Sequence, residues 1–353
     1  MTDLGSFTPP SSWPEEAWER RYPPLDLTLP SAQEILSTLP GHRSLKELQS
    51  LHLLEGGKRN TNYKLCFRNH SPLVLRIYEA DDTGPCRDRT IADLLGKTIP
   101  LPQMVYCSSD STLQGPDERE ILSKQTGNRP IALFEFIEGI HPFDLFRRGS
   151  PSEIDAFLAD LMGHLHRVHE ARSYSHHGLL NTDLEYREVF QSTRESFEDY
   201  ISWALSERSI RRRLGAPLRQ ELARYAKEKA PLLDEVDDHS LAHGDFKLSN
   251  LLIKTTGGAP KVAAILDWEY AFSGSLLFDL AIFLRHKKTL SYPLAAGVER
   301  AFSTLDYSLP KNFIAITETL DLMNLLGFLR GSQNRENLYA QVRKLIETTL
   351  QDF

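Results

Sequence analysis

The sequence is poor in cysteine. Its cysteines are odd in number and widely spaced, and they form no CxxC pair; they are Cys66, Cys86 and Cys107. Such a set supports neither a disulfide framework nor a zinc cluster. We therefore expect a protein of a reducing compartment.

The sequence also lacks long hydrophobic runs and an excess of positive charge. No run of about 18 consecutive apolar residues occurs, and the first residues show no basic segment followed by an apolar one. The formal net charge is -7, whereas nucleic-acid binders usually present a basic surface to the phosphates. We expect a cytoplasmic protein that binds neither nucleic acid nor membrane. We expect it to be a monomer or a homodimer.

The sequence does contain two successive patterns of apolar residues. Runs of β-forming residues come first, with a helix-like stretch near Arg87 to Leu95; the runs are "NYKLCFRN", "PLVLRIYEA", "PLPQMVYC" and "IALFEFIEG". After Pro151, apolar residues recur at helical spacing. We predict an α+β protein with a sheet-rich lobe over residues 41–138 and a mainly helical lobe over residues 139–353.

The first 40 residues are expected to form an arm and a short helix. The arm is rich in proline and serine, which favours a position on the surface rather than an independent domain. In "SAQEILSTL", Ser31 is followed three residues later by Glu34, a capping-box pattern that predicts a helix starting at Ser31.

One segment, "NLLIKTTGGAPKVAAILDWEY", interrupts the helical pattern. Two apolar runs flank Gly257 and Gly258, which predicts a β-hairpin. Asn250 precedes the first strand and Asp267 follows the second, and these two ends of an antiparallel hairpin lie side by side. Amide and carboxylate oxygens that converge in this way suit Mg²⁺. We therefore predict a magnesium site at Asn250 and Asp267.

The motifs on either side of this hairpin resemble a known family. "HGDFKLSN" resembles the catalytic loop of the aminoglycoside phosphotransferase and choline kinase-like family, and "ILDWEYAFSGSLLFDLA" resembles its metal-binding segment. The resemblance implies a two-lobed protein-kinase-like fold, with an N-terminal antiparallel sheet plus helix and a mainly helical C-terminal lobe that carries a catalytic β-hairpin. It also implies transfer of the γ-phosphate of ATP, or GTP, to a small-molecule hydroxyl with Mg²⁺.

The same resemblance implies a role for each polar residue of the two motifs. Asp245 would orient or deprotonate the acceptor hydroxyl, Lys247 would contact the γ-phosphate, and Asn250 and Asp267 would bind Mg²⁺. Positioning and charge neutralisation supply most of the rate in phosphoryl transfer. The supporting candidates are His243, which would hold the loop, Glu269, a further metal or acceptor contact, and Asp279, which would brace the loop from inside.

A kinase-like fold also requires a glycine turn, a strand cation and a helix carboxylate in the first lobe. The turn candidates are Gly56 and Gly57, followed by Asn60, and the cation candidate is Arg76 at the end of "PLVLRIY". Asp88 is the favoured carboxylate partner of Arg76, with Asp93 as the alternative. The segment that joins the lobes resembles the family's hinge, which places an adenine site at Phe134, Glu135, Phe136 and Ile137.

The acceptor itself stays open at this stage. The region from about residue 181 to 241 holds acidic and aromatic side chains that would suit a cationic amine, or would simply form exposed helix faces; they are Asp183, Glu185, Tyr186, Glu188, Glu198, Tyr200 and Trp203. Relatives phosphorylate aminoglycosides, macrolides, choline, ethanolamine, homoserine and sugar derivatives. An antibiotic-resistance enzyme and a metabolic kinase of the choline, ethanolamine or homoserine type are both compatible with the motifs.

Two rival hypotheses remain. A protein kinase is disfavoured because Gly244 replaces the arginine of the His-Arg-Asp motif and because no Ala-Pro-Glu motif follows. A pseudokinase that only binds ligands is disfavoured because Asp245, Asn250 and Asp267 are all present.

Overall fold

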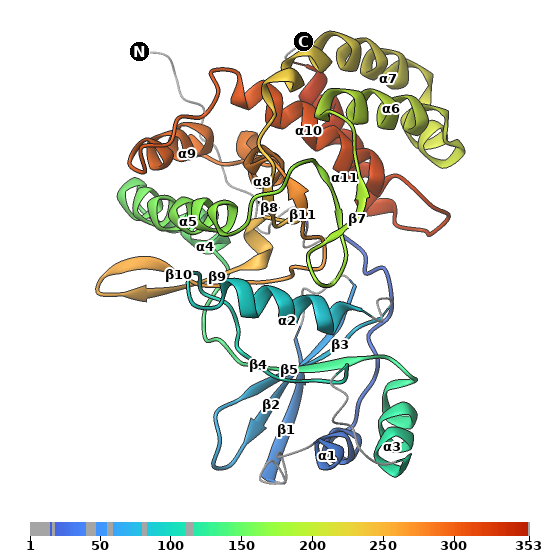
Figure 1. The fold of residues 1–353 in the computed structure, drawn as a ribbon, viewed down its shortest axis with the longest axis vertical. Coiled ribbons are helices and arrows are strands. Elements are labelled where there is room, and N and C mark those ends of the chain that lie inside the picture. The colour runs from blue at the N-terminus through green and yellow to red at the C-terminus, as the bar shows by residue number, and fades with distance from the viewer. Residues whose placement is uncertain are drawn as a thin grey trace.

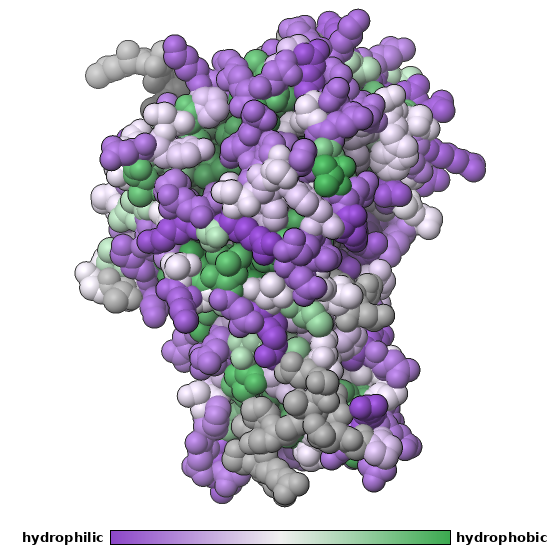
Figure 2. Space-filling model, viewed as in Figure 1, coloured by the Kyte–Doolittle hydropathy of each residue, from purple (hydrophilic) through white to green (hydrophobic). Residues whose placement is uncertain are grey.

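The computed structural model describes residues 15, 18–39, 47–54, 59–79, 83–109 and 116–351. Two lobes lie one above the other in Figure 1, the sheet-rich lobe below and the helical lobe above. Figure 2, in the same view, shows a mostly hydrophilic face with apolar residues in separate patches. None of the helices within the described ranges is long and apolar enough to cross a membrane.

The first lobe is built on an antiparallel sheet with the strand order β1-β2-β3-β5-β4. The strands are β1 (Leu48–Leu53), β2 (Thr61–Phe67), β3 (Leu73–Ile77), β4 (Met104–Cys107) and β5 (Ile131–Glu135). Buried and half-buried residues alternate along β2, as expected for a strand with one face against a core. The four predicted strands are confirmed as β2 to β5, while β1 was not predicted.

Three helices accompany the sheet: α1 (Leu29–Thr38), α2 (Gly84–Leu95) and α3 (Pro116–Thr126). The helix expected near Arg87 to Leu95 is α2, which lies between the sheet and the helical lobe (Figure 1). Ile35 of α1 and Leu122 of α3 pack into the same core as the strand residues Leu65 and Leu75. This core holds the sheet in place, and the sheet in turn positions the strand residues that face the second lobe.

The first helix begins two residues earlier than the capping-box pattern predicts. Its N-cap is Thr28, whose side chain accepts a hydrogen bond from the backbone N–H of Ser31. Pro30 lies in the first turn, where a missing N–H costs nothing and the fixed φ favours the helix. Ser31 is therefore inside the helix.

The second lobe contains eight α-helices within the described residues. They are α4 (Phe143–Arg148), α5 (Pro151–Ala171), α6 (Thr193–Ser206), α7 (Arg208–Lys229), α8 (Leu276–Phe283), α9 (Leu294–Ser303), α10 (Phe313–Phe328) and α11 (Glu336–Leu350), with short 3₁₀ helices at Ala230–Glu235, Leu248–Asn250 and Lys287–Thr289. Their apolar faces form one large core. The helical pattern after Pro151 is thus confirmed.

The sequence pattern suggests that the hairpin alone interrupts the helical lobe, but the structure contains a second interruption. A second sheet, with the order β7-β6-β11-β8, joins β6 (Gly178–Leu180), β7 (Tyr186–Val189), β8 (Ser240–Ala242) and β11 (Phe272–Gly274). The strand β7 begins at Tyr186, where the periodicity suggests helix, and α6 starts only after the capping box of Ser192 and Glu195. Strands of three or four residues are too short to show an alternating pattern.

The predicted hairpin is confirmed as β9 (Leu251–Thr256) and β10 (Ala259–Ile265). Gly257 and Gly258 form its turn with φ values of 62° and 86°, a conformation that glycine adopts without strain. Ile140, just after the last strand of the first lobe, forms an antiparallel bridge with Ile253 of β9. The hairpin is therefore attached to the segment that connects the two lobes.

Candidate active site

The predicted catalytic loop lies between β8 and the 3₁₀ helix Leu248–Asn250. Gly244 has a φ of 78°, and a Cβ at this position would lie 2.2 Å from the carbonyl oxygen of Tyr270. A side chain is therefore excluded by backbone contact, whereas glycine also accepts the left-handed conformation. The glycine that replaces the protein-kinase arginine has a steric reason in this fold.

The loop is held from behind by His243 and Asp279. The backbone N–H groups of His243 and Gly244 each donate to Asp279 at 2.8 Å, and Asp279 is fully buried. The Nε2 of His243 donates to the carbonyl of Leu266 at 2.9 Å, and its Nδ1 accepts from the N–H of Asp245 at 3.2 Å. Both residues are thus hydrogen-bonded to the backbone of the loop.

The side chain of Asp245 is held through one of its two oxygens. Lys247 Nζ lies 2.9 Å from Asp245 Oδ2, and the amide nitrogen of Asn250 donates to the same oxygen at 2.9 Å. Burial opposes the charge of Lys247, but Asp245 and Glu15 outweigh it and raise the pKa of the Lys247 ammonium. The second oxygen, Oδ1, has no hydrogen-bond partner among the residues that the structure describes.

Asp267 lies beside Asn250, as the hairpin predicts. The N–H of Leu266 donates to the carbonyl of Asn250 at 2.8 Å, and Asp267 itself adopts a left-handed φ of 64°. Its carboxylate forms a 2.7 Å ion pair with Arg76 and keeps 37% of its side chain exposed. Burial alone would raise the pKa of Asp267, but the charges of Arg76 and Lys247 lower it below its ordinary value.

The predicted ion pair between Arg76 and Asp88 is not formed in the described part of the chain. Asp88 instead accepts a hydrogen bond from the Tyr78 hydroxyl at 2.5 Å, and the guanidinium of Arg76 lies 5.0 Å from the centroid of the Tyr78 ring. Burial, together with the negative charge of Asp267, raises the pKa of Asp88. The alternative, Asp93, is exposed on α2. Arg76 pairs with Asp267 because the β3 strand end faces the hairpin end across the cleft.

A second link between the lobes involves Glu269. Asn60 donates its amide nitrogen to Glu269 at 3.2 Å, and Arg59 lies 3.5 Å from the same carboxylate. Burial and the nearby charge of Asp267 raise the pKa of Glu269. Arg87 of α2 donates to the Glu269 carbonyl at 2.5 Å, a contact that the sequence did not predict. The turn candidates Gly56 and Gly57 lie outside the described residues.

These side chains line one cleft of about 1740 Å³ between the lobes. The predicted residues that line it are Asn60, Arg76, Asp88, Phe134, Glu135, Phe136, Ile137, Asp245, Lys247, Asn250, Asp267 and Glu269. His243 and Asp279 are not among the lining residues and lie behind the loop. These predicted residues come from six separate segments of the chain, and the structure brings them together in one cleft.

The same cleft is also lined by residues that were not predicted to belong to the site. They come from the arm, from α6 and from the end of α10 and the segment after it; they are Glu15, Trp18, Arg20, Arg21, Tyr200, Met323, Asn324, Phe328, Arg330, Gln333 and Arg335. Of the acidic and aromatic candidates, only Tyr200 is among the lining residues. The acidic candidates are exposed elsewhere; they are Asp183, Glu185, Glu188 and Glu198.

Two described residues of the arm, Glu15 and Trp18, are buried in the protein, whereas the arm was expected to lie on the surface. Glu15 and Trp18 are each only 5% exposed. Arg285 forms ion pairs with Glu15 at 3.1 Å and with Asp321 at 2.7 Å. Burial opposes the charge of Glu15, yet Lys247, His286 and Arg285 lower the pKa of its carboxyl well below the ordinary value. No local pattern signals this anchor, since its partners lie about 270 residues away.

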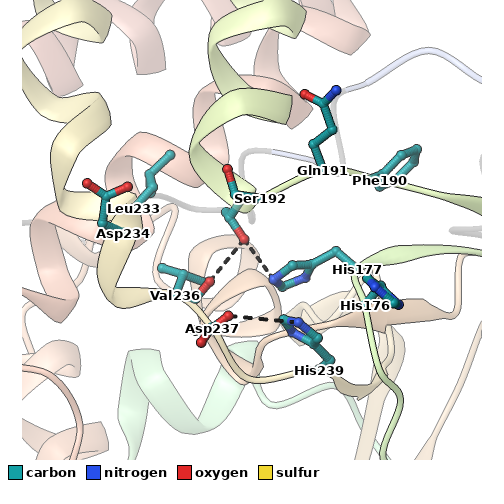
Figure 3. A pocket seen from close by; sticks show the side chains of 11 residues that line it. His176, His177, Phe190, Gln191, Ser192, Leu233, Asp234, Val236, Asp237 and His239 are labelled. Atoms are coloured by element: carbon teal, nitrogen blue, oxygen red, sulfur yellow. Dashed lines mark hydrogen bonds and ion pairs between the residues drawn. The ribbon is translucent and has the colours of Figure 1, made fainter.

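A second pocket, of about 450 Å³, lies in the helical lobe and contains none of the predicted site residues. Figure 3 shows its histidine side chains between the start of α6 and the segment before β8. The rings of His177 and His239 lie 4.3 Å apart, and the hydroxyl of Thr193 contacts His177 at 2.7 Å and the carbonyl of Val236 at 3.1 Å. These contacts join structural segments to one another, and we assign the chemistry to the cleft.

Comparisons with known proteins agree with this geometry. A family model described as the phosphotransferase enzyme family matches residues 50–310. A segment of 65 residues is 38% identical to acyl-CoA dehydrogenase family member 11 of Gallus gallus, covering 18% of this chain and 8% of that protein. The chain therefore spans less than a tenth of the length of that relative.

Solved structures share the fold. Aminoglycoside phosphotransferase APH(4)-Ia has a TM-score of 0.65 at 14% identity, over 92% of this chain and 99% of that chain. A thermostable mutant of it, in ternary complex with AMP-PNP and hygromycin B, has a TM-score of 0.61 at 16% identity, over 86% and 94%. The GDP and kanamycin complex of APH(2")-IIIa has a TM-score of 0.64 at 14% identity, over 92% and 99%. The predicted two-lobed α+β fold of the kinase-like type is confirmed.

Proposed function

The chain belongs to the phosphotransferase enzyme family, and from that premise we propose that it transfers the γ-phosphate of ATP, or GTP, to a hydroxyl group of a small molecule. The observation that carries this proposal is the convergence of Asp245, Asn250, Asp267 and Arg76 on one cleft between two lobes. Two of the structural neighbours were solved with a nucleotide and a small molecule together, which supports a cleft that holds both reactants.

We propose Asp245 as the residue that orients or deprotonates the acceptor hydroxyl. Its Oδ2 is held by Lys247 and Asn250, so that Oδ1 points its lone pairs toward whichever group enters the cleft. Lys247 is only 21% exposed and carries a fixed positive charge near the place where phosphate charge develops. The two residues together supply orientation and charge, the main requirements of phosphoryl transfer.

Asn250 and Asp267 fit a magnesium ion. Both hydrogen bonds that the Asn250 side chain makes with described residues use its amide nitrogen, which leaves the amide oxygen for a cation. The Asp267 carboxylate is open to the cleft and lies at the adjacent strand end. No cluster of three His, Cys, Asp or Glu side chains suited to a metal occurs in the described ranges, so the remaining ligands would be phosphate and water. When bound, Mg²⁺ would neutralise phosphate charge.

The nucleobase is proposed to bind at the segment that joins the lobes. The N–H groups of Glu135 and Phe136 already donate to Gln103 and Pro72 within the first lobe. The N–H of Ile137 has no partner among the residues that the structure describes, so it is available to the edge of a base. Phe134 lines the cleft beside it.

The test is ADP release from Mg·ATP across a panel of hydroxyl compounds that includes aminoglycosides, macrolides, choline, ethanolamine and homoserine. Each compound is measured with the wild-type protein and with Asp245→Ala as the blank. We expect at least one acceptor whose ADP release disappears in the blank. Wild-type protein that binds Mg·ATP in a thermal-shift experiment but never releases ADP would instead support a binding module.

A further inference from the structure

Several arginines outside the predicted site residues also line the cleft. They come from the arm and from the segment after α10, and they are Arg20, Arg21, Arg330 and Arg335. Among the described residues of the arm, Glu15 is the carboxylate that lines the cleft, and it forms an ion pair with Arg285 at 3.1 Å. A set of cations in a cleft concentrates field lines and attracts anions.

Arg335 is the most constrained of these cations. It is half-buried, and its Nη2 donates to the backbone carbonyl of Glu19 at 2.9 Å. Its Nε is buried and makes no hydrogen bond with any described residue, and it forms no ion pair with a described carboxylate. Burial lowers the pKa of the Arg335 guanidinium, and the nearby negative charge of Glu19 offsets this effect only in part. A bound anion would accept a hydrogen bond from the Nε of Arg335 and would offset the cost of burying its charge.

Arg330 and Arg21 also line the cleft. Arg330 lies 4.8 Å from the centroid of the Trp203 ring, and Arg21 lies 5.6 Å from that of Tyr22. Both side chains are exposed to the cleft, and neither forms an ion pair within the described part of the chain. Stacking on an aromatic face orients a guanidinium while leaving its N–H groups free to donate.

Hydrogen bonds join the arm and the segment after α10 into one wall. Gln333 donates its amide nitrogen to the carbonyl of Arg21 at 3.2 Å, and the Glu19 carboxylate accepts from the N–H groups of Asn337 and Leu338 at 2.9 and 3.2 Å. The arginines therefore stand on a fixed frame rather than on independent loops. Such a frame suits the bidentate binding of carboxylate or phosphate oxygens.

We propose that the acceptor is a hydroxyl compound with an anionic group, a carboxylate or a phosphate ester, and that Arg330 and Arg335 bind this group while the hydroxyl faces Asp245. The proposal rests on the proposed function. Trp18, Tyr200 and Phe328 line the same cleft, and their aromatic side chains would cover the uncharged part of the acceptor. A polycation such as kanamycin would meet four arginines in this cleft.

The experiment measures equilibrium binding by calorimetry to the full chain saturated with Mg·AMP-PNP, which fills the proposed nucleotide site. The probes are two matched series: glucose, glucosamine, glucuronate and glucose 6-phosphate, and glycerol, glycerate and glycerol 3-phosphate. We expect the anionic members to bind at least about tenfold more tightly than their neutral and cationic counterparts. Their relative affinities separate a carboxylate site from a phosphate site. Equal or tighter binding of neutral and cationic members, or no binding of any anion, overturns the proposal.

The variants Arg330→Gln and Arg335→Gln, alone and combined, locate the binding. We expect each to weaken anion binding about tenfold and to reduce its dependence on salt, with nucleotide affinity unchanged. The matched control is Arg212→Gln, an exposed arginine of α7 outside the cleft. Arg330 is itself exposed, so its variant tests the proposal even where Arg335→Gln lowers the melting temperature. Anion affinity that does not change in Arg330→Gln contradicts the proposal.

The ADP-release assay on the same compounds separates the two conclusions. Anion binding that depends on Arg330, without phosphoryl transfer to any compound, would remove the proposed function and retain the anion site. Transfer to neutral or cationic acceptors with no preference for anions would retain the function and remove the anion site.

Discussion

The residues proposed for the nucleotide and its metal lie on β3, at the end of β5 and on the β9–β10 hairpin, and we call this part of the cleft the nucleotide end. The residues proposed for the acceptor lie on the arm, α6 and the segment after α10, and we call this part the acceptor end. The first end is built on a hydrogen-bonded sheet and a tight hairpin. The second is held by side-chain contacts such as those of Glu15 and Glu19. The difference suggests that the chemistry is fixed by short local segments and the choice of acceptor by distant ones.

The largest expected effect is that of Asp245→Ala, which should change catalysis without changing nucleotide binding. We expect Asp245→Ala to lower kcat by about 10³-fold, a loss typical of a general base, while the Kd for Mg·ATP stays near that of the wild type. Single-turnover kinetics and nucleotide titration measure the two quantities. Near-normal turnover would show that the loop does not carry the chemistry.

Asp267→Ala should instead weaken nucleotide binding. It removes the proposed metal ligand and leaves Arg76 without its 2.7 Å partner. We expect the Kd for ATP in the presence of Mg²⁺ to rise by about 100-fold, and the difference between titrations with and without Mg²⁺ to disappear. Binding that remains as dependent on Mg²⁺ as in the wild type would place the metal elsewhere.

Phe134 and Phe136, in the segment that joins the lobes, are expected to contribute unequally to nucleotide binding. Phe134→Ala should raise the KM for ATP about tenfold, since it removes apolar area from the proposed base site. Phe136→Ala should have a smaller effect, because one face of that ring is already covered by Lys64 at 3.8 Å. The same effect for both variants would show that the two rings contribute equally.

The smallest expected effect on catalysis comes from Glu15→Gln in the arm. We expect the KM for the acceptor to change more than the KM for ATP, because Glu15 lines the cleft as part of the arm and acts on Lys247 only through its charge. The variant should also lower the free energy of unfolding by about 1 to 3 kcal/mol at neutral pH, since it weakens a buried hydrogen-bonded pair.

This stability difference should depend on pH in a defined direction. The pKa of Glu15 is lowered on folding from an ordinary value of 4.5, so its stabilisation is complete above that pH and is lost as the pH falls below it. Denaturant unfolding at pH 7 and at lower pH should therefore show the wild type and Glu15→Gln becoming more alike in acid. The control is Glu198→Gln, whose exposed pair with Arg194 should contribute less than about 1 kcal/mol. A constant difference across this range would mean that the carboxylate charge is not what anchors the arm.

Much of the fold was predictable because its signals are local. Four of the five strands of the first sheet, α2 and the catalytic hairpin each follow from a run of apolar residues and its turn. The second sheet was missed because its strands are three or four residues long. The start of α1 was misplaced because Thr28 and Ser31 are both good caps, and Pro30 decided between them.

Part of the candidate site could also be placed from the sequence. Asn250 and Asp267 were placed together from the hairpin alone, and the structure has them at adjacent strand ends. The partner of Arg76 could not be chosen from sequence, because the choice depends on how closely β3 approaches the hairpin across the lobes. Arg330 and Arg335 gave no signal at all, since an arginine after a helix is usually a solvated residue.

The hydrogen bonds between Glu19 and the start of α11 join residues that are 318 or 319 positions apart in the chain. Such contacts require nearly the whole chain to be ordered first, and closing long loops is slow. The sheet of the first lobe, whose β1–β2 and β2–β3 pairs are close in sequence, can form earlier. During refolding, the sheet of the first lobe should therefore form before the contacts between Glu19 and α11.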